Sequence, residues 1–295
     1  MQVKKVFVIG TGTMGSGIAQ VCAQTGYEVI IEDINDDVLR RAINTIKWSV
    51  GKLIEKGGIK GSAEEILSRI RGTTDIQDAK EADVVIEAIT ENLELKGDVF
   101  RQLGEICPPH TMLGTNTSSI PITYIAAATK RPGKVVGIHF FNPVPISRLV
   151  EVVKGLLTSE ETMKDAIEFS HSLGKETIRV NKDVAGFALN RFNAPSSVEA
   201  IRLVEQGVAS PEDIDRGVRL AYGRPQGPFE LADLNGLDVA LTVLENLYKE
   251  TGDPKFYPPM ILRRKVKAGQ LGRKTGVGWY RYDEKGNKIG LAEIV

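Results

Sequence analysis

A glycine-rich turn directly after the first apolar segment constrains the fold of this chain more than any other feature. The apolar residues 6–9 lead into Gly10-Thr11-Gly12-Thr13-Met14-Gly15, and helix-compatible sequence follows. In such a GxGxxG pattern the first glycine makes a tight turn, the second lets the backbone approach a pyrophosphate, and the third lets helix and strand pack closely. The turn therefore predicts a strand, a phosphate-binding loop and a helix that together bind a dinucleotide.

An acidic residue beyond the next predicted strand supports this hypothesis. Residues 28–32 form a second strand-like segment, and Asp33 follows it roughly 20 residues after the turn, as the fingerprint requires. Asp33 would accept hydrogen bonds from the adenosine ribose and would repel a 2′-phosphate, which favours NAD over NADP. A tight turn alone would not explain this acid. We assign to the cofactor site Gly10, Gly12, Thr13, Met14, Gly15 and Asp33.

The pattern along the chain indicates two domains. Strand-like and helix-like segments alternate at first, which is typical of a parallel sheet covered on both faces. The predicted strands are residues 4–9, 28–32, 83–88, 112–115, 134–138, 149–153 and 177–180, and residues 36–71 are predicted to form a helical excursion. After Asp183 helical segments predominate, one of them capped by Ser210. We predict a Rossmann-type, doubly wound, mostly parallel α/β domain over residues 1–183 and an all-α domain over residues 184–295.

Composition excludes several classes of protein. Lysine plus arginine balance aspartate plus glutamate at 38 each, so no net charge attracts the chain to nucleic acid or to an anionic membrane. No segment is long and apolar enough for a membrane span, and the N-terminal residues lack a signal-peptide pattern. Cys22 and Cys107 are too few for a disulfide framework and lack metal-ligand spacing, so we expect no metal and a cytoplasmic protein.

Only three histidines occur, so the choice of a general base is small. His110 falls in a predicted loop, and His171 falls on the charged face of a predicted helix. His139 ends a predicted strand, at the edge where ligands gather in open α/β sheets. Histidine also titrates near neutral pH, which suits proton transfer from a hydroxyl group that loses a hydride. His139 is therefore the predicted base.

An acid within an apolar segment is the predicted partner of this histidine. Glu151 lies in the middle of residues 149–153, where an unpaired charge would be costly to bury. Pairing with His139 would satisfy Glu151 and would fix the tautomer of the imidazole. A purely structural ion pair is the alternative interpretation.

A polar cluster follows another predicted strand. Asn116-Thr117-Ser118-Ser119 offers an amide and three hydroxyl groups that could hold a substrate oxygen, although capping of the next helix explains them equally well. No GxSxG motif surrounds Ser118, so an acyl-enzyme hydrolase is a poor interpretation.

With these motifs in this order, the chain resembles the L-3-hydroxyacyl-CoA dehydrogenases, including the bacterial 3-hydroxybutyryl-CoA dehydrogenases. The resemblance covers nearly the entire length. It extends through Gly186-Phe187, Asn190-Arg191, Gly227-Pro228-Phe229, Gly236-Leu237-Asp238, Gly272-Arg273-Lys274-Thr275-Gly276 and Gly278-Trp279-Tyr280.

The resemblance implies a two-domain enzyme that oxidises a short-chain (S)-3-hydroxyacyl-CoA reversibly with NAD. Its helical domain would close over the acyl-CoA and form a homodimer or a higher homo-oligomer. It also implies that His139 and Glu151 perform acid–base catalysis, and that Ser118 and Asn190 hold the reacting oxygen and the thioester. Further residues that it assigns are Glu91, Lys96, Asn116 and Ser118 at the cofactor, and Ser118, His139, Asn142, Asn190 and Lys56 at the substrate.

Two other functions remain compatible with the sequence. The first is a dehydrogenase of a 3-hydroxy acid without CoA, such as a sugar acid. The second is a catalytically idle NAD-binding protein with the same fold.

Overall fold

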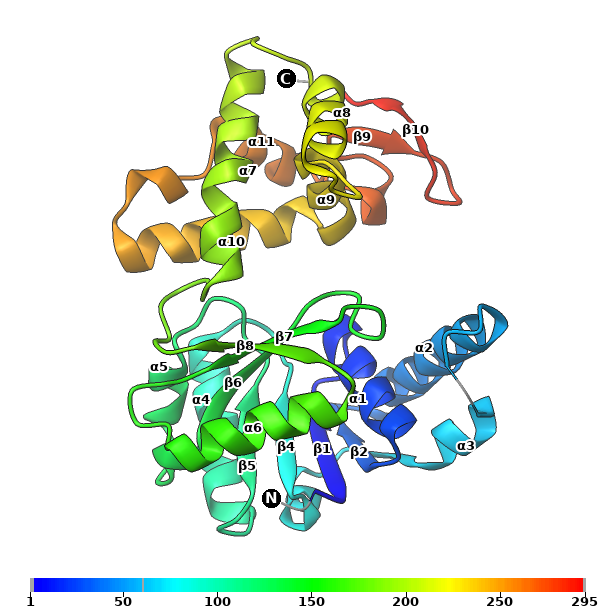
Figure 1. Cartoon of the computed structure of the whole chain (residues 1–295), viewed down its shortest axis with the longest axis vertical. Coiled ribbons are helices and arrows are strands. Elements are labelled where there is room, and N and C mark those ends of the chain that lie inside the picture. Colours follow the sequence, from blue (N-terminus) through cyan, green and yellow to red (C-terminus); the bar gives the residue numbers. More distant parts are fainter. Residues whose placement is uncertain (1–2, 60, 294–295) are drawn as a thin grey trace. The chain divides into compact units, whose positions relative to one another are not determined.

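The computed structural model describes residues 3–59 and 61–293, and the chain divides into two compact units, Met1–Val184 and Ala185–Val295. Figure 1 shows both units, coloured along the sequence. The composition shift places the boundary after Asp183, one residue earlier. Asp183 belongs to the first unit in the structure, because its carboxylate accepts a hydrogen bond of 2.5 Å from the backbone N–H of Thr123.

The first unit is built on an eight-stranded sheet of order β3-β2-β1-β4-β5-β6-β7-β8. All neighbouring strands pair in parallel except β6 and β7, which pair antiparallel. The strands are β1 (Lys5–Ile9), β2 (Glu28–Glu32), β3 (Ile70–Thr73), β4 (Val84–Glu87), β5 (Met112–Thr115), β6 (Val135–Phe140), β7 (Leu149–Val153) and β8 (Glu176–Val180). The predicted mostly parallel, doubly wound sheet is confirmed.

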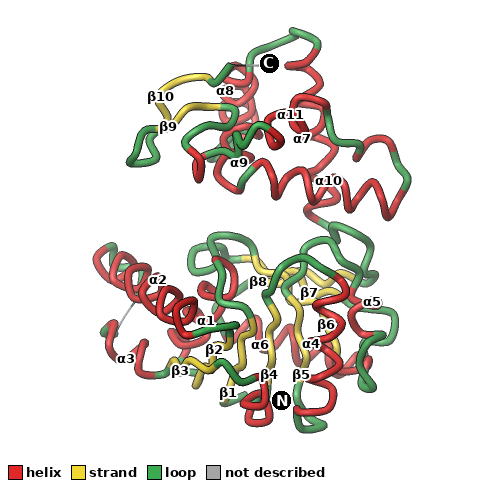
Figure 2. Tube along the Cα trace, turned by 180° about the vertical axis from the view of Figure 1, so that it is seen from behind, coloured by secondary structure: helices red, strands yellow, loops and turns green. Residues whose placement is uncertain are grey.

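Helices cover both faces of this sheet (Figures 1 and 2). On one face α1 (Thr13–Thr25), α2 (Asp36–Glu55) and α6 (Glu160–Ser172) share an apolar core with alternate residues of the strands. On the other face lie α4 (Leu93–Ile106) and α5 (Ile122–Ala126). The central strands are therefore buried on both sides, which explains why they are continuously apolar in the sequence.

The predicted helical excursion is right for α2 and α3 (Ala63–Ser68) but wrong at its end. The carboxamide of Asn35 caps α2 by accepting a 3.0 Å hydrogen bond from the N–H of Val38. Residues 70–73, which begin inside the predicted excursion, form β3 instead. This edge strand contains the exposed Arg71 and Gly72, so it lacks the apolar run that revealed the other strands. Short 3₁₀ helices occur at η1 (Ile76–Glu81) and η2 (Pro132–Lys134).

The second unit is mostly helical, as predicted, and also contains a β-hairpin that was not predicted. Its elements are α7 (Leu189–Glu205), α8 (Pro211–Tyr222), α9 (Pro228–Asn235), α10 (Leu237–Thr251), η3 (Pro254–Phe256), α11 (Met260–Lys267), η4 (Arg273–Thr275), β9 (Tyr280–Tyr282) and β10 (Lys288–Leu291). The Ser210 hydroxyl caps α8, because it accepts a 3.1 Å hydrogen bond from the N–H of Asp213. The strands β9 and β10 pair antiparallel, so the expectation of an all-α domain is wrong at this point.

Within the described residues, no helix has both the length and the apolar character needed to cross a membrane.

Candidate active site

The glycine-rich turn connects β1 to α1, and two of its glycines are required by the protein itself. Gly10 has a φ of 82°, and a Cβ there would lie 2.8 Å from the carbonyl oxygen of Ala88. A Cβ on Gly15 would lie 1.7 Å from the carbonyl oxygen of Gly10. A side chain at Gly10 would therefore force the turn away from the segment that follows β4, and a side chain at Gly15 would force the start of α1 away from the turn.

Gly12 differs from these two glycines, because the protein leaves space around it. Its φ of −64° is accessible to any residue, and a Cβ there would meet no atom within 4 Å. Gly12 is the N-cap of α1, where backbone N–H groups without helical partners face outward and favour an anionic ligand. The open space at Gly12 thus suits close approach of a pyrophosphate, and the turn fits a dinucleotide.

Asp33 is bound directly to this turn. The backbone N–H and the hydroxyl of Thr11 both donate to Oδ2 of Asp33, each at 2.7 Å. The N–H of Ile34 donates to Oδ1 at 2.8 Å. The sequence fingerprint identifies Asp33 but does not single out Thr11, although the hydroxyl of Thr11 between the first two glycines is a signal for this contact. Thr11 therefore fixes the orientation of the carboxylate.

His139 and Glu151 form the predicted pair. They are directly opposite each other in the antiparallel pairing of β6 and β7, so their side chains lie on the same face of the sheet. Nδ1 of His139 lies 2.7 Å from Oε2 of Glu151, and the two side chains are 7% and 0% exposed. Because the carboxylate of Glu151 accepts at Nδ1, Nε2 is the ring nitrogen at which a ligand could exchange a proton with His139. The ring of Phe141 packs against the imidazole at 4.6 Å between centroids.

The polar residues 116–119, here called the Ser118 loop, follow β5 at the same edge of the sheet. The carboxamide oxygen of Asn116 accepts a 2.9 Å hydrogen bond from the N–H of Phe140, the residue after His139. The loop is therefore joined to the strand that carries the histidine. Ser118 is half-buried, and its N–H donates to Glu91 at 2.9 Å.

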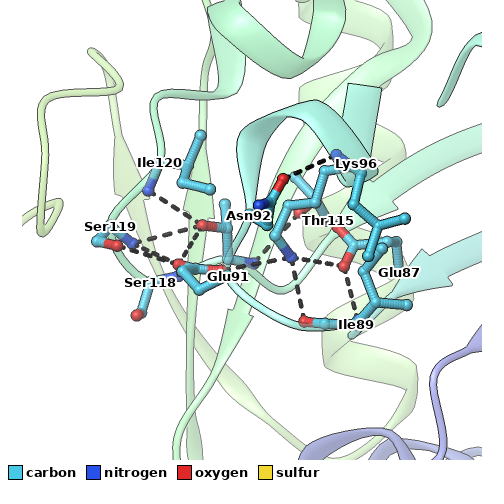
Figure 3. A network of polar contacts seen from close by, with 11 residues as sticks. Glu87, Ile89, Glu91, Asn92, Lys96, Thr115, Ser118, Ser119 and Ile120 are labelled. Atoms are coloured by element: carbon cyan, nitrogen blue, oxygen red, sulfur yellow. Dashed lines mark hydrogen bonds and ion pairs between the residues drawn. The ribbon is translucent and has the colours of Figure 1, made fainter. Parts of the chain in front are cut away.

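Glu91 holds this loop, and Lys96 lies behind it (Figure 3). Oε1 of Glu91 accepts from the Thr117 hydroxyl at 2.6 Å and from the N–H groups of Ser118 and Ser119 at 2.9 and 3.1 Å. Burial disfavours ionisation of Glu91, but the Lys96 ammonium and these hydrogen bonds outweigh burial and hold its pKa below the ordinary value. Lys96 is only 1% exposed and pairs with Glu87, a residue that no sequence motif singles out.

Comparison with known proteins gives a consistent result for both units. Residues 5–184 match the family model of the 3-hydroxyacyl-CoA dehydrogenase NAD binding domain, and residues 186–282 match that of the 3-hydroxyacyl-CoA dehydrogenase C-terminal domain. The chain belongs to the 3-hydroxyacyl-CoA dehydrogenase family. It is therefore an NAD-dependent oxidoreductase, and the predictions of the family, the fold class and the NAD cofactor are confirmed.

Individual members of the family are similar over nearly the whole chain. A probable 3-hydroxybutyryl-CoA dehydrogenase of Deinococcus radiodurans is 48% identical over 94% of this chain and 100% of the relative. A 3-hydroxybutyryl-CoA dehydrogenase of Clostridioides difficile is 44% identical over 95% of this chain and 100% of the relative. The crystal structure of an (S)-3-hydroxybutyryl-CoA dehydrogenase from Ralstonia eutropha matches 96% of this chain and 100% of its own, with 44% identity and a TM-score of 0.89.

The remaining predicted residues of this dehydrogenase lie in separate places. Asn142 is exposed in the connection between β6 and β7, and Lys56 is exposed at the C-cap of α2. Asn190 is half-buried near the start of α7, in the second unit. Thr13 and Met14 form the first turn of α1.

The other two histidines are surface residues of the dehydrogenase. His110 lies in a loop with 60% of its side chain exposed, and His171 is exposed near the end of α6. Among residues 3–59 and 61–293, no group of three or more histidine, cysteine or acidic side chains is placed to hold a metal ion.

Proposed function

We propose that this dehydrogenase catalyses the reversible, NAD-linked oxidation of a short-chain (S)-3-hydroxyacyl-CoA, with 3-hydroxybutyryl-CoA as the favoured substrate, to the 3-oxoacyl-CoA. The observation that carries the proposal is the buried His139–Glu151 pair on the strand joined to the Ser118 loop. The similarity to enzymes named 3-hydroxybutyryl-CoA dehydrogenases supports the choice of substrate.

The chemistry of the pair fits this reaction. In oxidation, Nε2 of His139 accepts the proton of the substrate hydroxyl, and in reduction it returns a proton to the carbonyl oxygen. Glu151 accepts the Nδ1–H, which keeps the imidazole in the required tautomer and stabilises the imidazolium that forms. The glycine-rich turn and Asp33 would hold NAD, which would supply the acceptor for the hydride that leaves the substrate carbon.

The other predicted residues have binding roles in this proposal. Ser118 and Asn190 hold the reacting oxygen and the thioester region, Asn142 lines the substrate site, and Lys56 contacts the CoA moiety. On the cofactor side, the turn of Gly10, Gly12, Thr13, Met14 and Gly15 binds the pyrophosphate. The nicotinamide end of the cofactor is bound by Glu91, Lys96, Asn116 and Ser118.

Asp33 selects NAD over NADP in this proposal. Thr11 holds one carboxylate oxygen with two hydrogen bonds of 2.7 Å, so the negative charge is fixed beside the turn. A 2′-phosphate would be repelled there, whereas two ribose hydroxyls would find acceptors.

The second unit is proposed to close over the substrate and to form the contact of a homodimer. Its exposed apolar side chains support self-association, since Phe192, Leu220 and Tyr222 are 75–80% exposed. We place the enzyme in the cytoplasm, because both cysteines are free and buried thiols.

The decisive experiment follows NADH oxidation at 340 nm with acetoacetyl-CoA and, separately, with free acetoacetate. We expect turnover with acetoacetyl-CoA and NADH, and much lower kcat/KM with free acetoacetate or with NADPH. Comparable turnover of the free acid would favour a CoA-independent dehydrogenase. Binding of NADH without any turnover would favour an idle NAD-binding protein, and equal use of NADPH would contradict the role of Asp33.

A further inference from the structure

A fully buried ion pair lies directly behind the Ser118 loop. Glu87 ends β4 and is 0% exposed, and its Oε1 lies 2.6 Å from Nζ of Lys96 on α4. The same carboxylate accepts from the N–H of Ile89 at 2.8 Å and from the hydroxyl of Thr115 at 2.7 Å. Both carboxylate oxygens of Glu87 are thus engaged inside the protein.

The ammonium group of Lys96 forms ion pairs with two carboxylates, those of Glu87 and Glu91. Nζ of Lys96 also lies 3.3 Å from Oε2 of Glu91 and 3.4 Å from the carbonyl oxygen of Ile89. Figure 3 shows that Lys96 lies between Glu87 and Glu91, and that the Glu91 side chain binds the Ser118 loop. The contacts therefore form a continuous series from Glu87 through Lys96 and Glu91 to the backbone of Ser118.

Electrostatics explains why Glu87 matters to the position of the loop. A buried ammonium is costly unless it is paired, and removing one partner of a buried pair leaves an uncompensated charge. Without the charge of Glu87, Lys96 would have Glu91 as its remaining carboxylate partner. The ammonium would then move toward Glu91, and the carboxylate that holds residues 117–119 would move with it.

We infer that Glu87 is a positioning residue of this dehydrogenase, which sets the Ser118 loop for the nicotinamide end of the cofactor through Lys96 and Glu91. The inference rests on the proposed function, because that function assigns Glu91, Asn116 and Ser118 to this end. Glu87 is 0% exposed and is bound to Lys96, Ile89 and Thr115, so its role in this inference is to position other groups rather than to contact a ligand. A buried ion pair that only stabilises the fold is the competing explanation.

The test is the variant Glu87→Gln, which keeps the size of the side chain and removes its charge. We expect the Kd for NADH, measured by fluorescence titration, to rise about tenfold with a parallel rise in its KM, because misplaced binding groups lose this much or more. Glu87→Asp, which keeps the charge, should recover part of the affinity. A lower melting temperature with an unchanged Kd for NADH would overturn the inference.

A double-mutant cycle tests the route through Lys96. In a Lys96→Met background, Glu87→Gln should add no further loss of NADH affinity, since the intermediate group is already absent. Additive losses would contradict the route. If Glu87→Gln does not fold, Glu87→Asp is the second variant: its shorter side chain draws the carboxylate away from Lys96, so the Kd for NADH should rise, and a Kd equal to that of the unmodified enzyme would also overturn the inference.

The matched control is Thr111→Val, at the residue just before the start of β5. This variant removes a buried hydroxyl that donates at 2.7 Å to the carbonyl oxygen of Ala82. It should lower the melting temperature and leave the Kd for NADH unchanged. The experiment also separates two kinds of failure. An unmodified enzyme that binds NADH without reducing acetoacetyl-CoA refutes the proposed function, whereas a normal Kd for NADH in Glu87→Gln refutes the positioning role.

Discussion

Both units bury carboxylates almost completely, but they surround them with different partners. In the first unit Glu151 faces a histidine and Glu87 faces a lysine. In the second unit Asp215 and Asp233, each 1% exposed, accept hydrogen bonds from backbone N–H groups and tyrosine hydroxyls. The partners of the first two acids are basic side chains, whereas those of the second two are neutral hydrogen-bond donors.

The acids of the second unit hold the hairpin against the helices. Asp233 accepts from the N–H groups of Trp279 and Tyr280 at 2.8 and 2.9 Å, and burial raises its pKa. Two neighbouring glycines leave it room, because a Cβ on Gly278 would lie 2.1 Å from its Oδ1 and a Cβ on Gly272 would lie 2.3 Å from its carbonyl oxygen. The glycine-rich segment near the C-terminus thus serves packing around a buried acid.

Burial of an acid therefore does not by itself indicate catalysis. The partner of the acid indicates whether the acid can take part in catalysis. A histidine can exchange a proton with a ligand, whereas a backbone N–H cannot. We therefore expect substitutions in the first unit to change turnover or cofactor binding, and substitutions of the buried acids in the second unit to change stability.

His139→Gln should have the strongest effect on activity. Loss of a general base lowers rates by roughly 10² to 10⁴, so kcat for acetoacetyl-CoA reduction should fall by about this range while NADH still binds. The measurement is steady-state turnover at saturating NADH, with the Kd for NADH as control. Turnover close to that of the unmodified enzyme would remove His139 from the mechanism.

Gly12→Ala should affect the cofactor without affecting the fold. Its Cβ meets no protein atom within 4 Å, so the melting temperature should fall only slightly, by the poorer preference of alanine for the N-cap position. We expect the KM for NADH to rise by about tenfold or more, because a methyl group would prevent close approach of the pyrophosphate. An unchanged KM for NADH would show that the pyrophosphate does not pass over Gly12.

Asp233→Asn should behave in the opposite way. The amide nitrogen cannot accept hydrogen bonds, so at least one buried donor loses its partner, at a cost of about 1–3 kcal/mol in the free energy of unfolding. Urea denaturation measures this loss. The kcat of the folded variant should equal that of the unmodified enzyme. A loss of kcat without a loss of stability would contradict the claim that the buried acids of the second unit act on stability alone.

Glu32→Gln should produce the smallest effect, and one that depends on pH. Burial, with the nearby carboxylates of Asp33 and Asp75, raises the pKa of Glu32 to about 7. Because the folded pKa exceeds the unfolded value, Glu32 stabilises the protein at low pH, and this contribution is lost as pH rises through 7. The variant should therefore be more stable than the unmodified enzyme at pH 8, by about 1 kcal/mol. Equal pH dependence of the melting temperature in both proteins would contradict this assignment.

Local patterns in the sequence predict the central strands, the glycine turn and the helix starts. The pairing of His139 with Glu151 follows from one further argument, that an acid in an apolar strand needs a partner. The same argument applied to Glu87, which ends the apolar run of β4, predicts that this acid also needs a partner, although it does not identify Lys96 as that partner. At the end of a strand an acid commonly faces water, so the sequence does not distinguish a buried Glu87 from an exposed one.

Other features could not be predicted because they depend on contacts between distant segments. The strand β3 is recognised only by its pairing with β2. The buried state of Asp233 depends on residues 279–282, nearly fifty positions later. Thr11 gains its importance only when the turn is brought against Asp33.

The most direct test of these assignments is the kcat of Glu151→Gln for acetoacetyl-CoA reduction, measured beside its melting temperature. If Glu151 acts through the proton chemistry of His139, kcat falls by at least about tenfold in a protein that folds and binds NADH with unchanged Kd. If kcat stays at the level of the unmodified enzyme and only the melting temperature falls, then Glu151 is a structural acid like Asp233, and the proposed acid–base pair is refuted.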